Sequence, residues 1–152
     1  MKKIIFIGSG NVATSLAVSL DENNYKILQI FSRSLSNAKL LADKVKAEAI
    51  DDLSKIKTAD IIIISIKDDF IKGILKSYHF DNIVHTSGSM DINIFDLKVK
   101  NFGVLYPIQT FNKEISIDLS ETPFLIECNN TSFEKSIREL AQSISSNVFK
   151  IK

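Results

Sequence analysis

Short apolar segments alternate along the chain with longer segments of helical periodicity. The apolar segments cover about 3–7, 26–31, 49–50, 61–66, 82–86, 102–106, 124–127 and 148–151, and the sixth is expected to stop before Pro107. Four of the intervals between them repeat apolar residues at the three- and four-residue spacing of an amphipathic helix. Such alternation is typical of α/β proteins with a parallel sheet. The pattern predicts a doubly wound, mostly parallel sheet of about seven to eight strands with helices on both faces.

Capping patterns mark the starts of two of the predicted helices. Asp68 or Asp69 can cap the helix after the isoleucine run, because a carboxylate accepts hydrogen bonds from the N–H groups of the first turn. Thr131 and Glu134 have the spacing of a capping box. The residues expected to face the sheet from the four helices are Val12, Leu16 and Leu20; Ala38, Leu41, Ala42 and Val45; Phe70, Ile71, Ile74 and Leu75; and Phe133, Ile137, Leu140, Ala141 and Ile144.

Composition and charge describe an ordinary globular domain. Of the 152 residues, 45% are hydrophobic and 24% charged, and the formal net charge is +1. This balance gives no electrostatic reason to expect a nucleic acid or a membrane surface as partner. No apolar stretch approaches the roughly 20 residues of a membrane span. A single cysteine, Cys128, excludes an intramolecular disulfide and fits a reducing compartment, so we expect a cytoplasmic protein.

The first strand leads directly into a glycine turn of characteristic spacing. Gly8, Gly10 and Ala13 form the pattern G-x-G-x-x-A between the strand and a helix. In such a turn the first glycine permits the sharp bend, the second lets a pyrophosphate approach the backbone, and alanine still allows close helix–strand packing. The helix N-terminus favours the anion. The pattern predicts a Rossmann-type NAD(P) site that includes Gly8, Ser9, Gly10, Asn11, Val12 and Ala13.

The end of the second strand indicates which dinucleotide is bound. NAD-binding domains place an acidic residue about 20 positions after the glycines, where it holds the ribose 2′-hydroxyl. Here the chain has Ser32, Arg33 and Ser34 instead. A guanidinium flanked by hydroxyls suits the dianionic 2′-phosphate, so the sequence favours NADP over NAD. The alternative is a surface arginine beside a serine that caps the next helix.

The ends of three later strands carry further candidates. The backbone of Ile66 and Lys67 is expected to pass the nicotinamide ribose, although Lys67 can equally be a solvated loop charge. His85, Ser87 and Tyr106 are candidate catalytic residues, because imidazole titrates near neutral pH and hydroxyls orient carbonyl groups. The alternative is a structural histidine in a strand, a serine turn, and a tyrosine packed at the sheet edge.

Other reactive residues are not expected to form a site. His79 lies in a polar turn, where we expect it to be exposed. Cys128 has no histidine near it in sequence and is expected to act as a small hydrophobic residue. No spacing of histidine, cysteine and carboxylate residues suggests a metal.

These motifs together resemble the N-terminal lobe of oxidoreductases related to pyrroline-5-carboxylate reductase and the deazaflavin-dependent NADP oxidoreductases. The resemblance rests on the opening 7–13, on 32–34 and on 60–68, and more specifically on 85–88 followed by 103–111. The last two segments resemble a bacterial subfamily of unassigned substrate. The resemblance covers nearly the whole chain, and it implies hydride transfer between NADP and an unknown small substrate.

In that subfamily a helical lobe follows the Rossmann lobe, builds the dimer and closes the active site. The chain ends where this lobe would begin, so we expect a single domain over 1–152 that lacks it, turns over little alone and self-associates. A non-catalytic dinucleotide-binding module, acting as a sensor or scaffold, is the main alternative. A Rossmann domain for another nucleotide is a further one.

Overall fold

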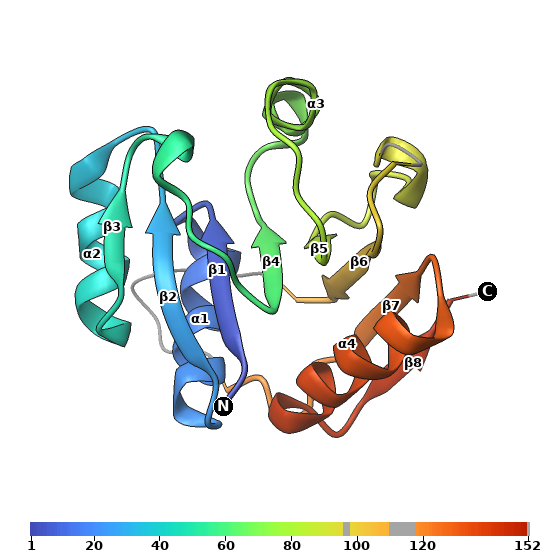
Figure 1. Cartoon of the computed structure of the whole chain (residues 1–152). Coiled ribbons are helices and arrows are strands. Elements are labelled where there is room, and N and C mark those ends of the chain that lie inside the picture. The colour runs from blue at the N-terminus through green and yellow to red at the C-terminus, as the bar shows by residue number, and fades with distance from the viewer. Residues whose placement is uncertain (96–97, 110–117, 152) are drawn as a thin grey trace.

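The structure is a computed structural model that describes residues 1–95, 98–109 and 118–151. The described residues form eight strands and four helices (Figure 1). The strands are β1 (Lys3–Ile7), β2 (Lys26–Phe31), β3 (Glu48–Ile50), β4 (Ile61–Ile64), β5 (Ile83–His85), β6 (Phe102–Pro107), β7 (Phe124–Cys128) and β8 (Val148–Lys150). The helices are α1 (Asn11–Glu22), α2 (Leu35–Val45), α3 (Asp68–Ser77) and α4 (Thr131–Ile144), with short 3₁₀ turns at Leu53–Lys55 and Ile92–Ile94.

All eight strands lie in one sheet in the order β3-β2-β1-β4-β5-β6-β7-β8. Every neighbouring pair is parallel except β6 and β7. The first six strands therefore have the 3-2-1-4-5-6 order of a dinucleotide-binding domain, whose chain reverses its direction of travel across the sheet beside β1. The predicted fold class is confirmed.

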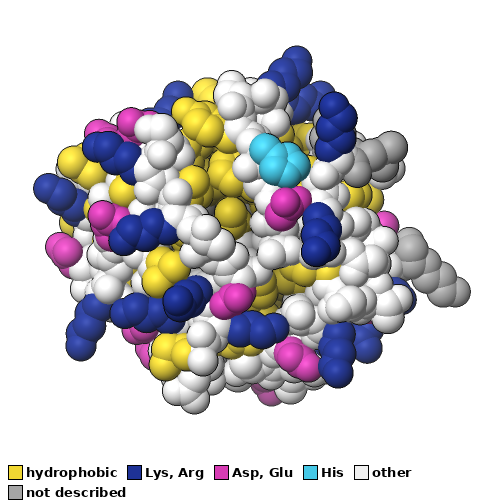
Figure 2. Space-filling view, in the orientation of Figure 1, with side chains coloured by type: hydrophobic (Ala, Val, Ile, Leu, Met, Phe, Trp, Pro, Cys, Tyr) yellow, Lys and Arg dark blue, Asp and Glu magenta, His cyan; other side chains and the backbone are white. Residues whose placement is uncertain are grey.

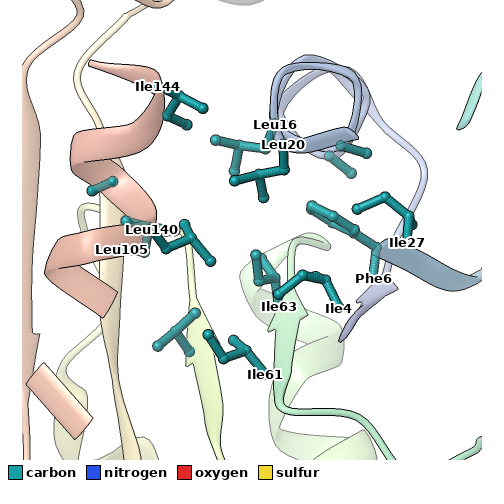
Figure 3. Packing of buried hydrophobic residues seen from close by; sticks show 14 of the residues in the cluster. Ile4, Phe6, Leu16, Leu20, Ile27, Ile61, Ile63, Leu105, Leu140 and Ile144 are labelled. Atoms are coloured by element: carbon teal, nitrogen blue, oxygen red, sulfur yellow. The ribbon is translucent and has the colours of Figure 1, made fainter. Parts of the chain in front are cut away.

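One face of the sheet is covered by α1, α2 and α4 (Figure 1). Figure 3 shows Leu16 and Leu20 of α1 pointing into the same layer as Leu140 of α4 and Phe6 of β1. The apolar faces predicted for these three helices are confirmed, with Val12 partly buried against the cluster. At about 25 cal/mol per Å² of apolar surface removed from water, such a layer is the main stabilising contribution of the fold.

The other face packs against α3 and the two 3₁₀ turns. The isoleucines of β4 alternate between the two cores: Ile61 and Ile63 belong to the first, Ile62 and Ile64 to the second. Successive side chains of a strand point to opposite faces, so a continuous apolar run is required where both faces are covered. The strand ends at Ile64, two residues before the predicted end.

Both predictions about helix caps are wrong. The N-cap of α3 is Lys67, whose side chain makes no capping bond, and Asp68 and Asp69 lie inside the first turn. The N-cap of α4 is Asn130, whose side-chain oxygen accepts a hydrogen bond from the N–H of Phe133 at 2.8 Å. An asparagine one position earlier thus takes the capping role that the sequence assigned to Thr131.

Two other expectations about the elements need correction. Phe70 does not join the buried face of α3, because the residue is 40% exposed, whereas Ile71 beside it is buried. β6 does not stop before Pro107, because Pro107 is itself the last residue of the strand, opposite Phe124 of β7. Since β6 pairs with β5 only as far as Val104, the missing N–H of Pro107 breaks no hydrogen bond on that side.

On the face shown in Figure 2, Lys and Arg side chains are interspersed with Asp and Glu side chains. Within the described ranges, no helix is both long enough and apolar enough to cross a membrane.

Candidate dinucleotide-binding site

A cleft of ≈ 740 Å³ lies at the carboxyl ends of the strands. Segments that follow β1, β2, β4 and β5 line it, together with Tyr106 of β6 and the first turns of α1 and α3. Ligands of open α/β sheets bind at this edge, where the strand order reverses. The lining residues are Gly8, Ser9, Gly10, Asn11, Val12, Phe31, Ser32, Arg33, Ser34, Asn37, Ile64, Ser65, Ile66, Lys67, Asp68, Phe70, Ile71, Ile74, Thr86, Ser87, Gly88 and Tyr106.

The glycine turn forms the middle of the cleft. Gly8 has a φ of +125°, which side chains rarely permit, and its N–H donates to the carbonyl of Phe31 at 2.9 Å. Gly10 is the N-cap of α1, and a Cβ on it would have no neighbour within 4 Å. The backbone at Gly10 is therefore open to a ligand, and the first turn of α1 has no acidic residue to repel an anion.

Ala13 is the one predicted cofactor residue that lies outside the cleft. It is fully buried in the core between α1 and the sheet. Its small side chain allows close packing of the helix on the strand, which is the role expected of the third position of the motif.

Ser32, Arg33 and Ser34 form the end of the cleft beyond β2. The hydroxyl of Ser34 caps α2 by accepting from the N–H of Asn37 at 3.4 Å, and the hydroxyl of Ser32 accepts from the N–H of Ser34 at 3.3 Å. Arg33 is exposed, and its guanidinium carbon lies 4.1 Å from the ring centre of Phe70. This end of the cleft thus presents a cation backed by an aromatic ring.

The opposite end of the cleft is rich in hydroxyl groups. Asp68 Oδ2 accepts hydrogen bonds from Ser87 Oγ at 3.1 Å and from Ser89 Oγ at 2.8 Å. Thr86 Oγ1 donates to Ser65 Oγ at 3.0 Å. These bonds tie the first turn of α3 and the end of β4 to the segment after β5, and they place several polar groups side by side.

Tyr106 lies against the glycine of the same segment. A Cβ on Gly88 would be 2.4 Å from Cζ of the Tyr106 ring. The ring therefore packs on the bare backbone, and it walls the cleft on the β6 side. Thr110 and Phe111, which end the motif 103–111, lie outside the described residues.

His85 is close in sequence to this cluster but does not line the cleft. It is fully buried, and its ring stacks on Phe95 with centres 5.8 Å apart. Its Nδ1 accepts from the N–H of Ser87 at 3.1 Å, whereas Nε2 has no hydrogen-bond partner among the described residues. Burial lowers the pKa of His85, although Asp68 and Asp91 and the backbone of Asp91 and Met90 act in the opposite direction. The neutral ring therefore accepts a hydrogen bond at Nδ1 and fixes the position of Ser87, the start of the segment that lines the cleft after β5.

The structure thus brings together most of the residues predicted from the sequence. Besides the residues already described, the predicted residues that line the cleft are Ser9, Asn11, Val12, Ile66, Lys67, Ser87 and Tyr106. Two predicted residues, Ala13 and His85, do not line it. Sequence reasoning missed Asp68, Thr86, Ser65 and Phe70. Their position after strand ends was visible, but their partners lie far away in the chain.

His79 and Cys128, which the sequence did not place in a site, lie outside the cleft. His79 is exposed as expected and lies 3.3 Å from Asp81. Burial and the carboxylates of Glu134 and Glu127 raise the pKa of the Cys128 thiol to about 12. In the part of the chain that the structure describes, no three His, Cys, Asp or Glu residues are grouped as a metal site would require.

Comparison with known proteins identifies relatives of this chain in sequence and in fold. The sequence model of the family described as "NADP oxidoreductase coenzyme F420-dependent" matches residues 3–87. A Bacteroides fragilis protein that carries the provisional name NADP oxidoreductase is 35% identical; the match covers 99% of this chain and 61% of that one, with a TM-score of 0.91. No protein with a curated description matches significantly.

Two more distant structures share the fold. The 1-pyrroline-5-carboxylate reductase of Streptococcus pyogenes is 19% identical over 99% of this chain and 58% of its own, with a TM-score of 0.79. The prephenate dehydrogenase from A. aeolicus, solved with NAD⁺ and hydroxyphenyl propionate, is 15% identical over 100% and 60%, with a TM-score of 0.77. The chain spans less than two thirds of the length of each of these three proteins.

Proposed function

The chain belongs to the coenzyme F420-dependent NADP oxidoreductase family, and from this premise we propose that its cleft binds NADP for hydride transfer to or from a small substrate. The domain is the dinucleotide-binding part of an oxidoreductase. The proposal concerns which dinucleotide it takes and which residues contact it.

The residues present fit a dinucleotide. The open backbone at Gly10 and the N-terminus of α1 suit a pyrophosphate, because they combine free space with N–H donors and a favourable dipole. Ile66 and Lys67 lie at the end of β4, where their backbone would flank the nicotinamide ribose. These groups would serve NAD and NADP equally.

The observation that supports NADP is the end of β2. There Arg33 lies in the same cleft as the glycine turn, between two serines, at the place where an NAD-binding domain has a carboxylate. A guanidinium forms charge-assisted hydrogen bonds with a phosphate, and it gains nothing comparable from a ribose hydroxyl. Arg33 would therefore distinguish the two cofactors.

The other end of the cleft would hold the substrate. The nicotinamide supplies or accepts the hydride, so the protein has to bind, orient and shield the reactants. Ser87 and Tyr106 line that end and carry hydroxyls that can orient a carbonyl or imine group. His85 would act as a positioning residue, through the N–H of Ser87, because its own ring does not reach the cleft.

A fluorescence titration tests the proposal. Binding is followed by the emission of the reduced nicotinamide, measured against the same concentration of free NADPH. Arg33→Ala should weaken NADPH binding roughly ten- to a hundredfold, which corresponds to about 1.5–3 kcal/mol, and should leave NADH binding nearly unchanged. Lys39→Ala removes the same charge from an exposed position of α2 outside the cleft and serves as the control.

Equal losses for NADPH and NADH in Arg33→Ala would show that Arg33 does not contact the 2′-phosphate. A wild-type chain that binds neither cofactor would contradict the proposal altogether. Hydride transfer is tested separately, by NADPH oxidation with coenzyme F420, small imines and 2-oxo acids as acceptors.

A further inference from the structure

A stack between Arg33 and Phe70 joins the two sides of the cleft. Arg33 follows β2, and Phe70 lies in the first turn of α3, after β4. Because β1 lies between β2 and β4 in the sheet, the two residues come from opposite sides of the cleft, with the glycine turn between them. The distance of 4.1 Å from the guanidinium carbon to the ring centre is that of a cation–π contact.

The position of Phe70 is not explained by packing of the core. Phe70 is 40% exposed, although the next residue, Ile71, is 1% exposed and packs against the sheet. A leucine or methionine would cover the same surface. Only an aromatic ring offers a negatively polarised face to a cation, and the cation above this ring is Arg33.

From this contact we infer that Phe70 determines cofactor specificity by holding Arg33 in place for the 2′-phosphate. The inference rests on the proposed function, in which Arg33 binds that phosphate. A free arginine side chain loses many rotamers when it binds a ligand. Stacking on Phe70 removes part of that freedom beforehand, so less is lost on binding.

The stack leaves the binding groups of Arg33 available. A ring covers one face of the guanidinium, whereas its N–H donors point outward in the guanidinium plane. Phosphate oxygens can therefore approach from the edge while Phe70 stays in contact. Phe70 is in this sense a positioning residue, which acts on the cofactor through Arg33.

Phe70→Leu tests the inference because it keeps apolar bulk but removes the ring. We expect NADPH affinity to fall about two- to fivefold, the range of an exposed cation–π contact, with NADH affinity unchanged. Phe70→Tyr keeps the ring and should restore wild-type affinity. Tyr78→Leu removes an aromatic ring at the other end of α3, outside the cleft, and should have no effect.

A double-mutant cycle shows whether Phe70 acts through Arg33. Phe70→Leu should add no loss of NADPH affinity in an Arg33→Ala background. The same loss with and without Arg33, an equal loss for NADH, or no loss at all would overturn the inference. Thermal unfolding checks that each variant is folded, and Phe70→Met replaces Phe70→Leu if the latter is not.

The same titrations separate the two proposals. A wild-type chain that does not prefer NADPH over NADH contradicts the proposed cofactor, and this inference fails with it. A wild-type preference that Phe70→Leu leaves intact contradicts only the role of Phe70.

Discussion

A methyl group on Gly8 would lie 2.1 Å from the carbonyl oxygen of Ser65. The two residues follow the neighbouring parallel strands β1 and β4, and the N–H of Ser65 donates to the carbonyl of Ile7 at 2.8 Å. Gly8 is thus required for the close approach of two strand ends. Gly10, two residues later, has open space where a side chain would be. The two glycines of the motif are therefore needed for different physical reasons: Gly8 allows the close approach of two strand ends, and Gly10 leaves open space.

The first prediction tests the two roles by substituting each glycine in turn. Gly8→Ala forces a methyl group onto backbone at a φ of +125° and should destabilise the fold by about 3 kcal/mol or more. Gly10→Val places its side chain in the cleft and should change stability by less than about 1 kcal/mol while NADPH binding is lost. Urea unfolding and NADPH titration of both variants check this. Normal binding by a folded Gly10→Val would refute the placement of the pyrophosphate.

The second prediction concerns Tyr106. Gly88→Ala should push the ring of Tyr106 away, because the new methyl group would overlap it, yet it should cost little stability since Gly88 is exposed. Of the three tyrosines, only Tyr106 should change its ring resonances in an NMR spectrum of tyrosine-labelled protein. Gly73→Ala, whose methyl group would meet nothing within 4 Å in α3, is the control and should stabilise the helix by up to about 1 kcal/mol. Unchanged Tyr106 signals in Gly88→Ala would contradict the packing.

The periodicity of the sequence is sufficient to predict the strands, the helices and the buried faces of α1, α2 and α4, because each of these depends on residues close together in the chain. The position of Phe70 could not be predicted in this way. Helical spacing groups it with Ile71 and Ile74, but Phe70 is exposed and lines the cleft. Whether a ring there meets the core or Arg33 depends on tertiary structure alone.

The same limit applies to the substrate end of the cleft. The sequence predicts Asp68 or Asp69 as a helix cap, because carboxylates often have that role near a helix start. Its observed partners, Ser87 and Ser89, are 19 and 21 residues away. His85 was expected to be either catalytic or structural, and only the stacking on Phe95 and the shape of the cleft show that its ring is enclosed.

The third prediction is that Cys128 is unreactive in the folded protein. With a pKa raised to about 12, the thiol is almost entirely protonated at pH 8, and the thiolate is the reactive form. Labelling by a thiol reagent should be slow in buffer and fast in urea, so its rate reports unfolding. Rapid labelling of the native chain at pH 8 would show that the burial around Cys128 is incomplete.

The fourth prediction concerns the pH dependence of stability and follows from His85. Its pKa in the folded state is below the usual 6.5, because burial disfavours the charged ring. Above pH 6.5 the ring is neutral in both states and adds no pH dependence. Below pH 6.5 the unfolded chain binds the proton more readily, so the free energy of unfolding falls as the pH is lowered toward the folded pKa. The slope from this residue is at most about 1.4 kcal/mol per pH unit.

His85→Asn isolates this contribution. Asparagine can still accept the hydrogen bond that Ser87 N–H donates to Nδ1, but it does not titrate. Urea unfolding between pH 7.5 and about 5.5 stays above the range in which most carboxylates titrate. We expect the wild type and His79→Asn, which changes the exposed histidine, to lose stability over this interval, and His85→Asn to lose much less.

An identical slope in all three proteins would mean that His85 is not kept neutral by burial. A slope that disappears in His79→Asn would assign the proton uptake to the surface histidine instead.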